Sequence, residues 1–133
     1  MLSGHCECGR VRFEVDGEIV DFSHCHCSQC RRLHGAAYAT FAGVDRDQFR
    51  YLAGDTDIST FSSSASNDRV FCSICGSTIL VDPRDEPEYL YLSMSTLDGD
   101  PPRPAGYHAY VGSRAPWHEI TDDLPQYDTE PPE

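Results

Sequence analysis

The 133-residue sequence predicts a mainly β protein, with many short strands, little helix and a single domain. Three observations lead to this prediction. Apolar and polar residues alternate over short stretches, turn-forming glycines and prolines separate those stretches, and cysteine pairs far apart in the chain could share a metal. We expect the domain to span residues 1–127 and the acidic residues 128–133 to form a flexible tail.

The N-terminal region predicts two strands. Residues 11–15 alternate between apolar and charged side chains, which is the period of a half-buried strand. The dipeptide Asp16-Gly17 follows and predicts a hairpin turn, so residues 19–22 are expected to form the returning strand.

The middle of the chain predicts one short helix and then further strands. Residues 28–34 could form about two helical turns, with Ser28 as the N-cap and Gly35 as the stop. Strands are expected at residues 38–41, 70–71, 78–81, 89–94 and 107–111.

The composition excludes several classes of partner and chemistry. The net charge is -12, which disfavours nucleic acids and anionic membranes as partners. With no long apolar run and no apolar N-terminal stretch, we expect neither a membrane span nor a secretory signal, and a reducing cytoplasm as the compartment. All ten basic residues are arginines, so no side chain can form a Schiff base.

Four of the seven cysteines form two pairs that are far apart in sequence. Cys6 and Cys8 are spaced to point to one face of an extended chain, and Cys72 and Cys75 flank a turn that ends in Gly76. Two such pairs usually assemble a structural zinc site with four thiolates. We therefore predict one closed zinc site, the four-cysteine cluster, on Cys6, Cys8, Cys72 and Cys75.

The remaining cysteines, Cys25, Cys27 and Cys30, form the three-cysteine cluster. Three protein ligands with an open fourth position are typical of a catalytic zinc. A histidine could close the site instead, although His24 and His26 would face away in a strand. An iron–sulfur site, a redox-active pair of Cys27 and Cys30, and free buried thiols are the other interpretations.

Other side chains near this cluster are candidates for catalysis. Arg31 and Arg32 directly follow Cys30, and they could balance thiolate charge, bind a carboxylate or be solvated. His34 could act as an acid or base, or cap the helix. The remaining candidates are Tyr38 and Tyr107 as oxyanion donors or core aromatics, His34, His108 and His118 as closing ligands, His108 and His118 as neighbours of the site, and Trp117 in the core.

Four segments, "GHCECGRVRFEV", "HCHCSQCRRLHG", "FCSICGSTI" and "WHEITDDLPQY", carry a family resemblance. In order and spacing the chain resembles the glutathione-dependent formaldehyde-activating enzymes, a family that includes the centromere protein V type domain, from Ser3 to Tyr127. The resemblance implies a β-tent fold of short antiparallel sheets pinned by zinc. It also implies a structural zinc on the four-cysteine cluster and a second zinc, open to a substrate thiol, on the three-cysteine cluster.

The family's activity joins formaldehyde and glutathione into S-hydroxymethylglutathione. We therefore expect a zinc-dependent carbon–sulfur lyase that acts on a thiol–aldehyde adduct, with a thiol such as glutathione and a small aldehyde as its partners. Its expected catalytic residues are Cys25, Cys27, Cys30, Arg31 and His34. The alternative is a non-catalytic, zinc-stabilised binding module of the same fold, with a fourth protein ligand or an unoccupied site, and a redox sensor is a third hypothesis.

Overall fold

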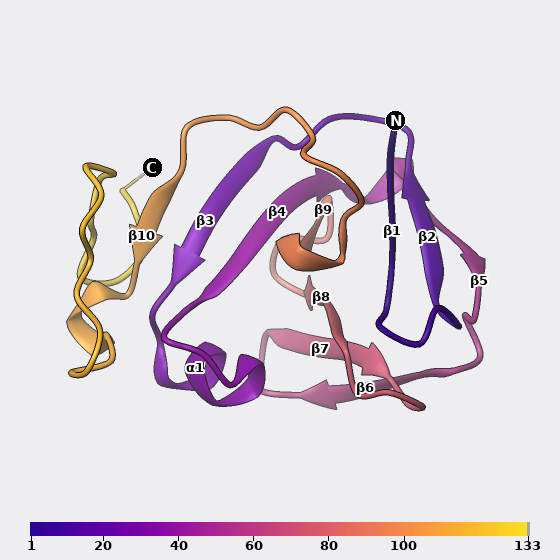
Figure 1. Cartoon of the computed structure of the whole chain (residues 1–133), viewed down its shortest axis with the longest axis horizontal. Helices are drawn as coiled ribbons and strands as arrows, with labels where there is room; N and C mark the ends of the chain where they lie inside the picture. The colour runs from indigo at the N-terminus through magenta and orange to yellow at the C-terminus, as the bar shows by residue number, and fades with distance from the viewer. Residues whose placement is uncertain (133) are drawn as a thin grey trace.

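The computed structural model describes residues 1–132 and is built from two β-sheets with little helix, so the predicted fold class is confirmed (Figure 1). The smaller sheet is antiparallel, in the order β1-β2-β5. The larger sheet has the order β10-β3-β4-β9-β8-β7-β6 and is antiparallel except for the parallel pair of β10 and β3.

The strands are short, as the sequence predicts. The smaller sheet contains β1 (Leu2–His5), β2 (Arg12–Val15) and β5 (Phe49–Ala53). The larger sheet contains β3 (Asp21–Cys25), β4 (Ala39–Asp45), β6 (Ile58–Ser62), β7 (Asn67–Cys72), β8 (Thr78–Pro83), β9 (Tyr89–Ser93) and β10 (Tyr107–Ala109). The helical elements are α1 (Ser28–His34) and the 3-10 turns η1 (Arg46–Gln48), η2 (Met94–Thr96) and η3 (Val111–Ser113).

The main core lies between the two sheets. The alternating residues Val11, Phe13 and Val15 are fully buried, as predicted, and they pack with apolar side chains of the larger sheet such as Leu90 and Leu92. Burying each of these side chains contributes roughly 1.5–3 kcal/mol. The smaller sheet is therefore fixed against the larger one by apolar packing, independently of any metal.

The predicted hairpin at Asp16-Gly17 is wrong. The strand β2 pairs with β1 on one side and β5 on the other, so neither of its edges is left for a returning strand. The chain bends at these two residues, where the backbone N–H of Asp16 donates to the carbonyl of Gln48 at 2.8 Å, and continues into β3 of the other sheet. The turn dipeptide thus marks a crossover between sheets.

Helix α1 occupies the predicted residues, but its N-cap differs from the prediction. The Sγ atom of Cys27, not the hydroxyl of Ser28, accepts the hydrogen bond from the backbone N–H of Cys30. Gly35 ends the helix as expected, in the left-handed conformation that glycine adopts without strain. Because Cys27 is the N-cap, the hydrogen bond that begins the helix also orients this thiol.

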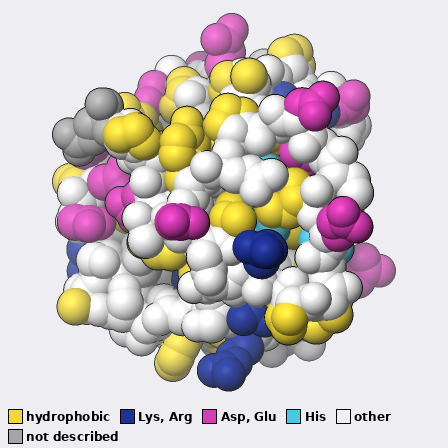
Figure 2. Space-filling model, turned by 90° about the vertical axis from the view of Figure 1, so that its left-hand side faces the viewer, with side chains coloured by type: hydrophobic (Ala, Val, Ile, Leu, Met, Phe, Trp, Pro, Cys, Tyr) yellow, Lys and Arg dark blue, Asp and Glu magenta, His cyan; other side chains and the backbone are white. Residues whose placement is uncertain are grey.

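The C-terminal segment lies beside β10, on the side of that strand away from β3 (Figure 1). Tyr110 and Gly112 donate backbone hydrogen bonds to the carbonyls of Thr129 and Asp128. Figure 2 shows this face, where acidic side chains are scattered and histidine atoms are visible only in recesses. The division of the chain at residue 127 stays a prediction, and residue 133 of the expected tail lies outside the described residues.

The prediction that Trp117 belongs to the core is wrong, because its side chain is 70% exposed on the C-terminal segment.

Within residues 1–132, no helix is long and apolar enough to cross a membrane.

Candidate functional site

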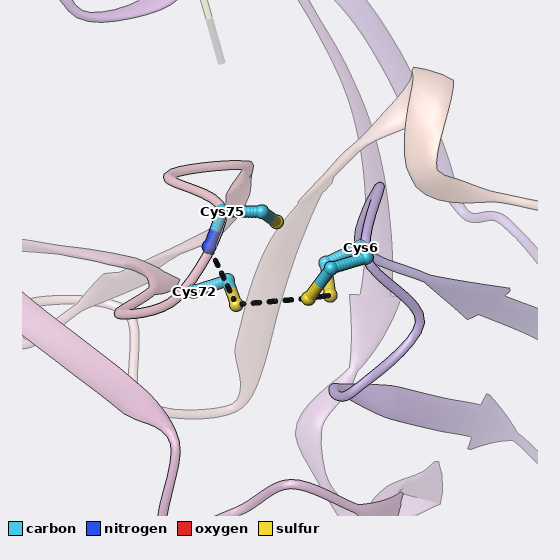
Figure 3. Close-up of side chains that lie close together, drawn as sticks. Cys6, Cys72 and Cys75 are labelled. Carbon is cyan, nitrogen blue, oxygen red and sulfur yellow. Dashed lines mark hydrogen bonds between the residues drawn. The ribbon is translucent and has the colours of Figure 1, made fainter.

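The structure brings the four-cysteine cluster together between the two sheets. Cys6 and Cys8 lie in the loop from β1 to β2, and Cys72 and Cys75 lie at the turn from β7 to β8 (Figure 3). The four Sγ atoms lie within 4.8 Å of one another, with 3.5 Å between Cys6 and Cys8 and 3.8 Å between Cys8 and Cys72. A tetrahedral zinc with bonds of about 2.3 Å requires sulfur separations of about 3.8 Å, so the cluster fits this metal.

Backbone N–H groups donate hydrogen bonds to sulfur atoms of this cluster and so stabilise negative charge on them. The N–H groups of Ile74 and Cys75 donate to the Sγ atom of Cys72 at 3.4 and 3.5 Å, and that of Val11 donates to Cys6 at 3.4 Å (Figure 3). Hydrogen bonds from the hydroxyl and backbone of Ser77 lower the pKa of Cys75 to about 5. These donors stabilise thiolates, which are the form of cysteine that binds a metal.

The three-cysteine cluster forms where β3 runs into α1. Cys25 is the last residue of β3, Cys27 caps the helix, and Cys30 lies in its first turn. Their three Sγ atoms lie within 4.8 Å of one another, which again suits one metal ion. Hydrogen bonds from Cys25 and Cys30 hold the pKa of Cys27 well below its ordinary value, which favours the thiolate form of this side chain.

A buried arginine from a distant strand contacts this cluster. Arg69, on β7, is only 6% exposed, and its two terminal nitrogens lie 3.5 and 3.6 Å from the Sγ atom of Cys30. Its Nε donates to the hydroxyl of Ser63 at 3.1 Å. Within residues 1–132 it makes no salt bridge to a carboxylate, so the sulfur cluster supplies the negative charge that a buried guanidinium requires.

The three-cysteine cluster opens into a cavity of about 840 Å³, which is large enough for a small ligand. Its wall contains the three cysteines, Arg69 and three tyrosines whose hydroxyl groups each donate to a carboxylate. The tyrosine–carboxylate pairs are Tyr107 with Asp21 at 3.1 Å, Tyr91 with Glu86 at 2.9 Å and Tyr110 with Glu130 at 3.4 Å.

Tyr110 differs from the other two tyrosines in its backbone and its surroundings. It has a φ of 58°, and this is the one positive φ at a residue other than glycine in the described part of the chain. Burial, and after it the charges of Glu130, Cys25 and Cys27, raise the pKa of its hydroxyl. The group therefore stays protonated close to the sulfurs, and it can donate a hydrogen bond to a ligand there.

The histidines proposed to close the second site have other partners. His26 Nε2 and His108 Nδ1 lie 2.8 Å apart, and His108 Nε2 lies 3.0 Å from Asp122. His24 Nδ1 lies 2.8 Å from the hydroxyl of Thr40. The group of possible ligands around Cys25, found among the residues that the structure describes, thus contains no histidine. The ring of Tyr38 packs against His26 on one side and against His118 on another.

Two predicted catalytic residues lie on α1 but not on the cavity wall as far as residues 1–132 define it. Arg31 is half-buried, and its Nε makes no hydrogen bond with the described residues. The ring of His34 packs edge-on against Phe41, and burial, with Arg69 adding to it, lowers its pKa to about 4. Their catalytic roles stay predictions, while Arg32 is exposed to solvent.

Sequence reasoning missed Arg69, Tyr110 and the three carboxylates of the cavity. Arg69 lies 39 residues from Cys30 in the chain, and only the pairing of β7 in the larger sheet brings them together. The sequence contained one signal for Arg69: it directly precedes the apolar residues Val70 and Phe71 of a predicted strand. A charged residue next to a buried strand segment indicates a buried partner.

Comparisons with known proteins agree with this geometry. The family model of the glutathione-dependent formaldehyde-activating enzyme matches residues 1–113. A protein of Halomonas elongata, provisionally named as such an enzyme, is 34% identical to this chain, over 90% of this chain and 81% of the Halomonas protein's length. An uncharacterized lyase of Schizosaccharomyces pombe is 25% identical to this chain, over 57% of this chain and 53% of the lyase's own length.

A solved structure supports the fold. The crystal structure of a Rhodobacter sphaeroides protein superposes with a TM-score of 0.62 at 27% identity, and it covers 75% of this chain and 91% of that protein. The two cysteine clusters, the two-sheet fold and the match over residues 1–113 lead to one conclusion: the chain belongs to the glutathione-dependent formaldehyde-activating enzyme family.

Proposed function

We propose that the protein is a carbon–sulfur lyase that makes and breaks the adduct of a thiol with a small aldehyde. One observation carries the proposal: three cysteine sulfurs converge on the wall of a cavity, and within residues 1–132 no fourth protein ligand joins them. A purely structural site would be closed by four protein ligands, as the four-cysteine cluster is. The names of the relatives suggest glutathione and formaldehyde as the two substrates, and such chemistry suits a reducing cytoplasm.

Zinc is the metal that suits both sulfur clusters, with Cys6, Cys8, Cys72 and Cys75 as structural ligands and Cys25, Cys27 and Cys30 as the open set. When bound at the open set, the metal would keep a substrate thiol deprotonated, which makes it a nucleophile at neutral pH. Arg69 offsets the excess negative charge of the three cysteine thiolates and so allows a further thiolate to approach.

The reaction transfers one proton and forms one bond. The thiol sulfur bonds to the aldehyde carbon, the carbonyl double bond becomes a carbon–oxygen single bond, and the proton lost from sulfur ends on that oxygen. The hydroxyl of Tyr110, which donates to Glu130 at 3.4 Å, lies on the same wall as the sulfurs, and on turning away from that carboxylate it would donate a hydrogen bond to the developing oxyanion. The reverse reaction breaks the carbon–sulfur bond and returns the proton to sulfur.

The test is exchange of ¹³C-labelled formaldehyde between its free form and its thiol adduct, followed by NMR. Zinc-loaded protein should accelerate the exchange at least 100-fold over the uncatalysed rate, and Cys27→Ser should abolish the acceleration. Thr60→Ala, an exposed change on β6 away from the cavity, is the matched control and should retain full activity. No acceleration with a folded, zinc-loaded protein would favour the non-catalytic binding module.

A further inference from the structure

Two buried histidines and an aspartate form a chain of hydrogen bonds, the Asp122–His108–His26 relay, that the proposed reaction does not use. His26 lies between Cys25 and Cys27 in the chain, and the side chains of both histidines are only 1% exposed. Nε2 of His26 lies 2.8 Å from Nδ1 of His108, and Nε2 of His108 lies 3.0 Å from a carboxylate oxygen of Asp122. None of the three side chains lies on the cavity wall as residues 1–132 define it.

The surroundings of the two rings decide which of their nitrogens carry the protons. Nδ1 of His26 is buried and has no hydrogen-bond partner among the described residues. A buried N–H group without an acceptor is rarer in proteins than a buried acceptor without a donor, so the proton of His26 belongs on Nε2. It is then donated to Nδ1 of His108, whose own proton lies on Nε2 and is donated to Asp122. The carboxylate at the end of the relay thus fixes the tautomer of both rings.

The relay also holds the main chain between two of the cysteines. The backbone N–H of His26 donates to the carbonyl of Ala109 at 2.9 Å, and its ring donates to His108, the preceding residue on β10. Two successive residues of one strand therefore fix His26 at its backbone and at its ring. Since successive side chains of an extended segment point to opposite faces, a fixed His26 directs Cys25 and Cys27 toward the cavity on the other face.

The C-terminal segment anchors the other end of the relay. The backbone N–H of His108 donates to the carbonyl of Pro125 at 2.8 Å, and the carbonyl of His108 accepts from the N–H of Tyr127 at 2.9 Å. One carboxylate oxygen of Asp122 also accepts from the backbone N–H of Leu124 at 3.1 Å. The carboxylate is therefore oriented by its own loop, and that loop is paired with the strand that carries His108.

We propose that Asp122 is a positioning residue of the three-cysteine cluster and that it acts through His108 and His26. Removing a group that orients metal ligands from behind lowers metal affinity by about 10- to 100-fold in other metal sites. The C-terminal segment thus contributes to the open site a side chain that lies off the cavity wall. This inference rests on the metal that the proposed function requires at the three-cysteine cluster, but not on the lyase reaction.

The first test locates the protons by ¹⁵N NMR of zinc-loaded protein labelled at histidine. In the wild type, His26 and His108 should both carry their proton on Nε2, and the two facing ring nitrogens should show a scalar coupling across their hydrogen bond. Asp122→Ala should replace this single pattern by a mixture of tautomers, whereas Asp123→Ala, a change at the exposed neighbour, should keep it. A proton on Nδ1 of either ring in the wild type would overturn the relay.

The second test measures metal affinity with cobalt(II), whose absorption reports thiolate ligands, in variants that keep only one of the two clusters. Asp122→Ala should lower the cobalt affinity of the three-cysteine cluster at least tenfold and leave that of the four-cysteine cluster within about twofold. Asp123→Ala should change neither affinity. An equal loss at both clusters would show a general structural role and would contradict the positioning of one site.

The outcomes separate this inference from the proposed function. If the three-cysteine cluster binds cobalt equally well in Asp122→Ala and in the wild type, the inference is wrong and the open metal site stands. If this cluster takes up no cobalt in the folded wild-type protein, both the inference and the open-site lyase are wrong.

Discussion

At the scale of single residues, a buried guanidinium constrains the state of the sulfurs beside it. Arg69 is almost fully buried, and its partners are the Sγ atom of Cys30 and the hydroxyl of Ser63. A buried charge without a counter-charge would cost several kcal/mol. The three-cysteine cluster must therefore stay anionic in the folded protein, which is the state that binds a metal.

Replacing this arginine should weaken the open site selectively. We expect Arg69→Met to lower the cobalt affinity of the three-cysteine cluster at least tenfold, about 1.4 kcal/mol, because thiolate repulsion is no longer balanced. The measurement is a cobalt titration, in which the two clusters are resolved by single-cluster variants. Arg32→Met, an exposed change on α1, should leave both affinities unaltered, and an equal loss in the two variants would contradict the argument.

Tyr110 provides a second residue-scale prediction. Its hydroxyl is protonated and close to the sulfurs, so Tyr110→Phe should lower kcat for adduct exchange by about 10²-fold, in the range seen when one oxyanion donor is removed. Binding of the thiol to the cobalt protein should stay within about twofold, since no ligand of the metal changes. Tyr89→Phe, outside the cavity, is the control, and equal kcat values in Tyr110→Phe and wild type would exclude the role.

We expect His34 to make the free energy of unfolding depend on pH. Its folded pKa is about 4, below the ordinary value of 6.5, because burial disfavours the charged ring. The unfolded chain therefore binds the proton first, so this residue contributes stability above pH 6.5 that is lost as the pH falls toward 4. In urea titrations at matched pH, His34→Gln should reduce this loss. His5→Gln, an exposed change on β1, should not, and identical slopes in both variants would refute the assignment.

At the scale of elements, β7 connects the two cysteine clusters. It places Arg69 beside the three-cysteine cluster and contributes Cys72 to the four-cysteine cluster, three residues apart on one strand. The loop from β1 to β2 supplies the other half of the closed cluster from the smaller sheet. The four-cysteine cluster thus joins the two sheets, whereas the three-cysteine cluster lies within the segment from β3 to α1.

This difference predicts unequal costs of losing a ligand. Cys75→Ser should lower the free energy of unfolding by about 3 kcal/mol or more, because a structural zinc site contributes on the order of 10 kcal/mol to folding. Cys27→Ser should cost about 1 kcal/mol or less, because a serine hydroxyl is itself a favourable N-cap and can accept the same hydrogen bond from the backbone N–H of Cys30. Chemical denaturation of the zinc-loaded proteins measures both costs. A larger loss in Cys27→Ser than in Cys75→Ser would reverse the structural assignment of the two clusters.

Some elements could be predicted from the sequence and others could not, for physical reasons. The strand at residues 11–15 and the stop of α1 at Gly35 follow from local patterns, and both are found in the structure. The strands β5 and β6 were missed because their side chains are mostly exposed, so no alternating apolar pattern marks them. The hairpin predicted at Asp16-Gly17 was wrong because a turn dipeptide does not reveal which strand edges are already paired.

At the scale of the whole molecule, the same division between local and distant information applies to the site. Grouping the cysteines by sequence spacing predicted the two sets that the structure brings together, because each pair or triplet is local. The cavity could not be predicted, since its wall combines β3, α1, β7, β9 and the C-terminal segment. Arg69, Tyr110 and Glu130 line the same cavity only after the larger sheet and the last residues have assembled.

The zinc content of protein purified without chelator tests the central claim most directly. The account predicts two zinc ions per chain in the wild-type protein and one in Cys27→Ser, with the variant still folded by circular dichroism. One zinc ion in both proteins would contradict it, because the three-cysteine cluster would then hold no metal and the proposed lyase would have no reactive centre.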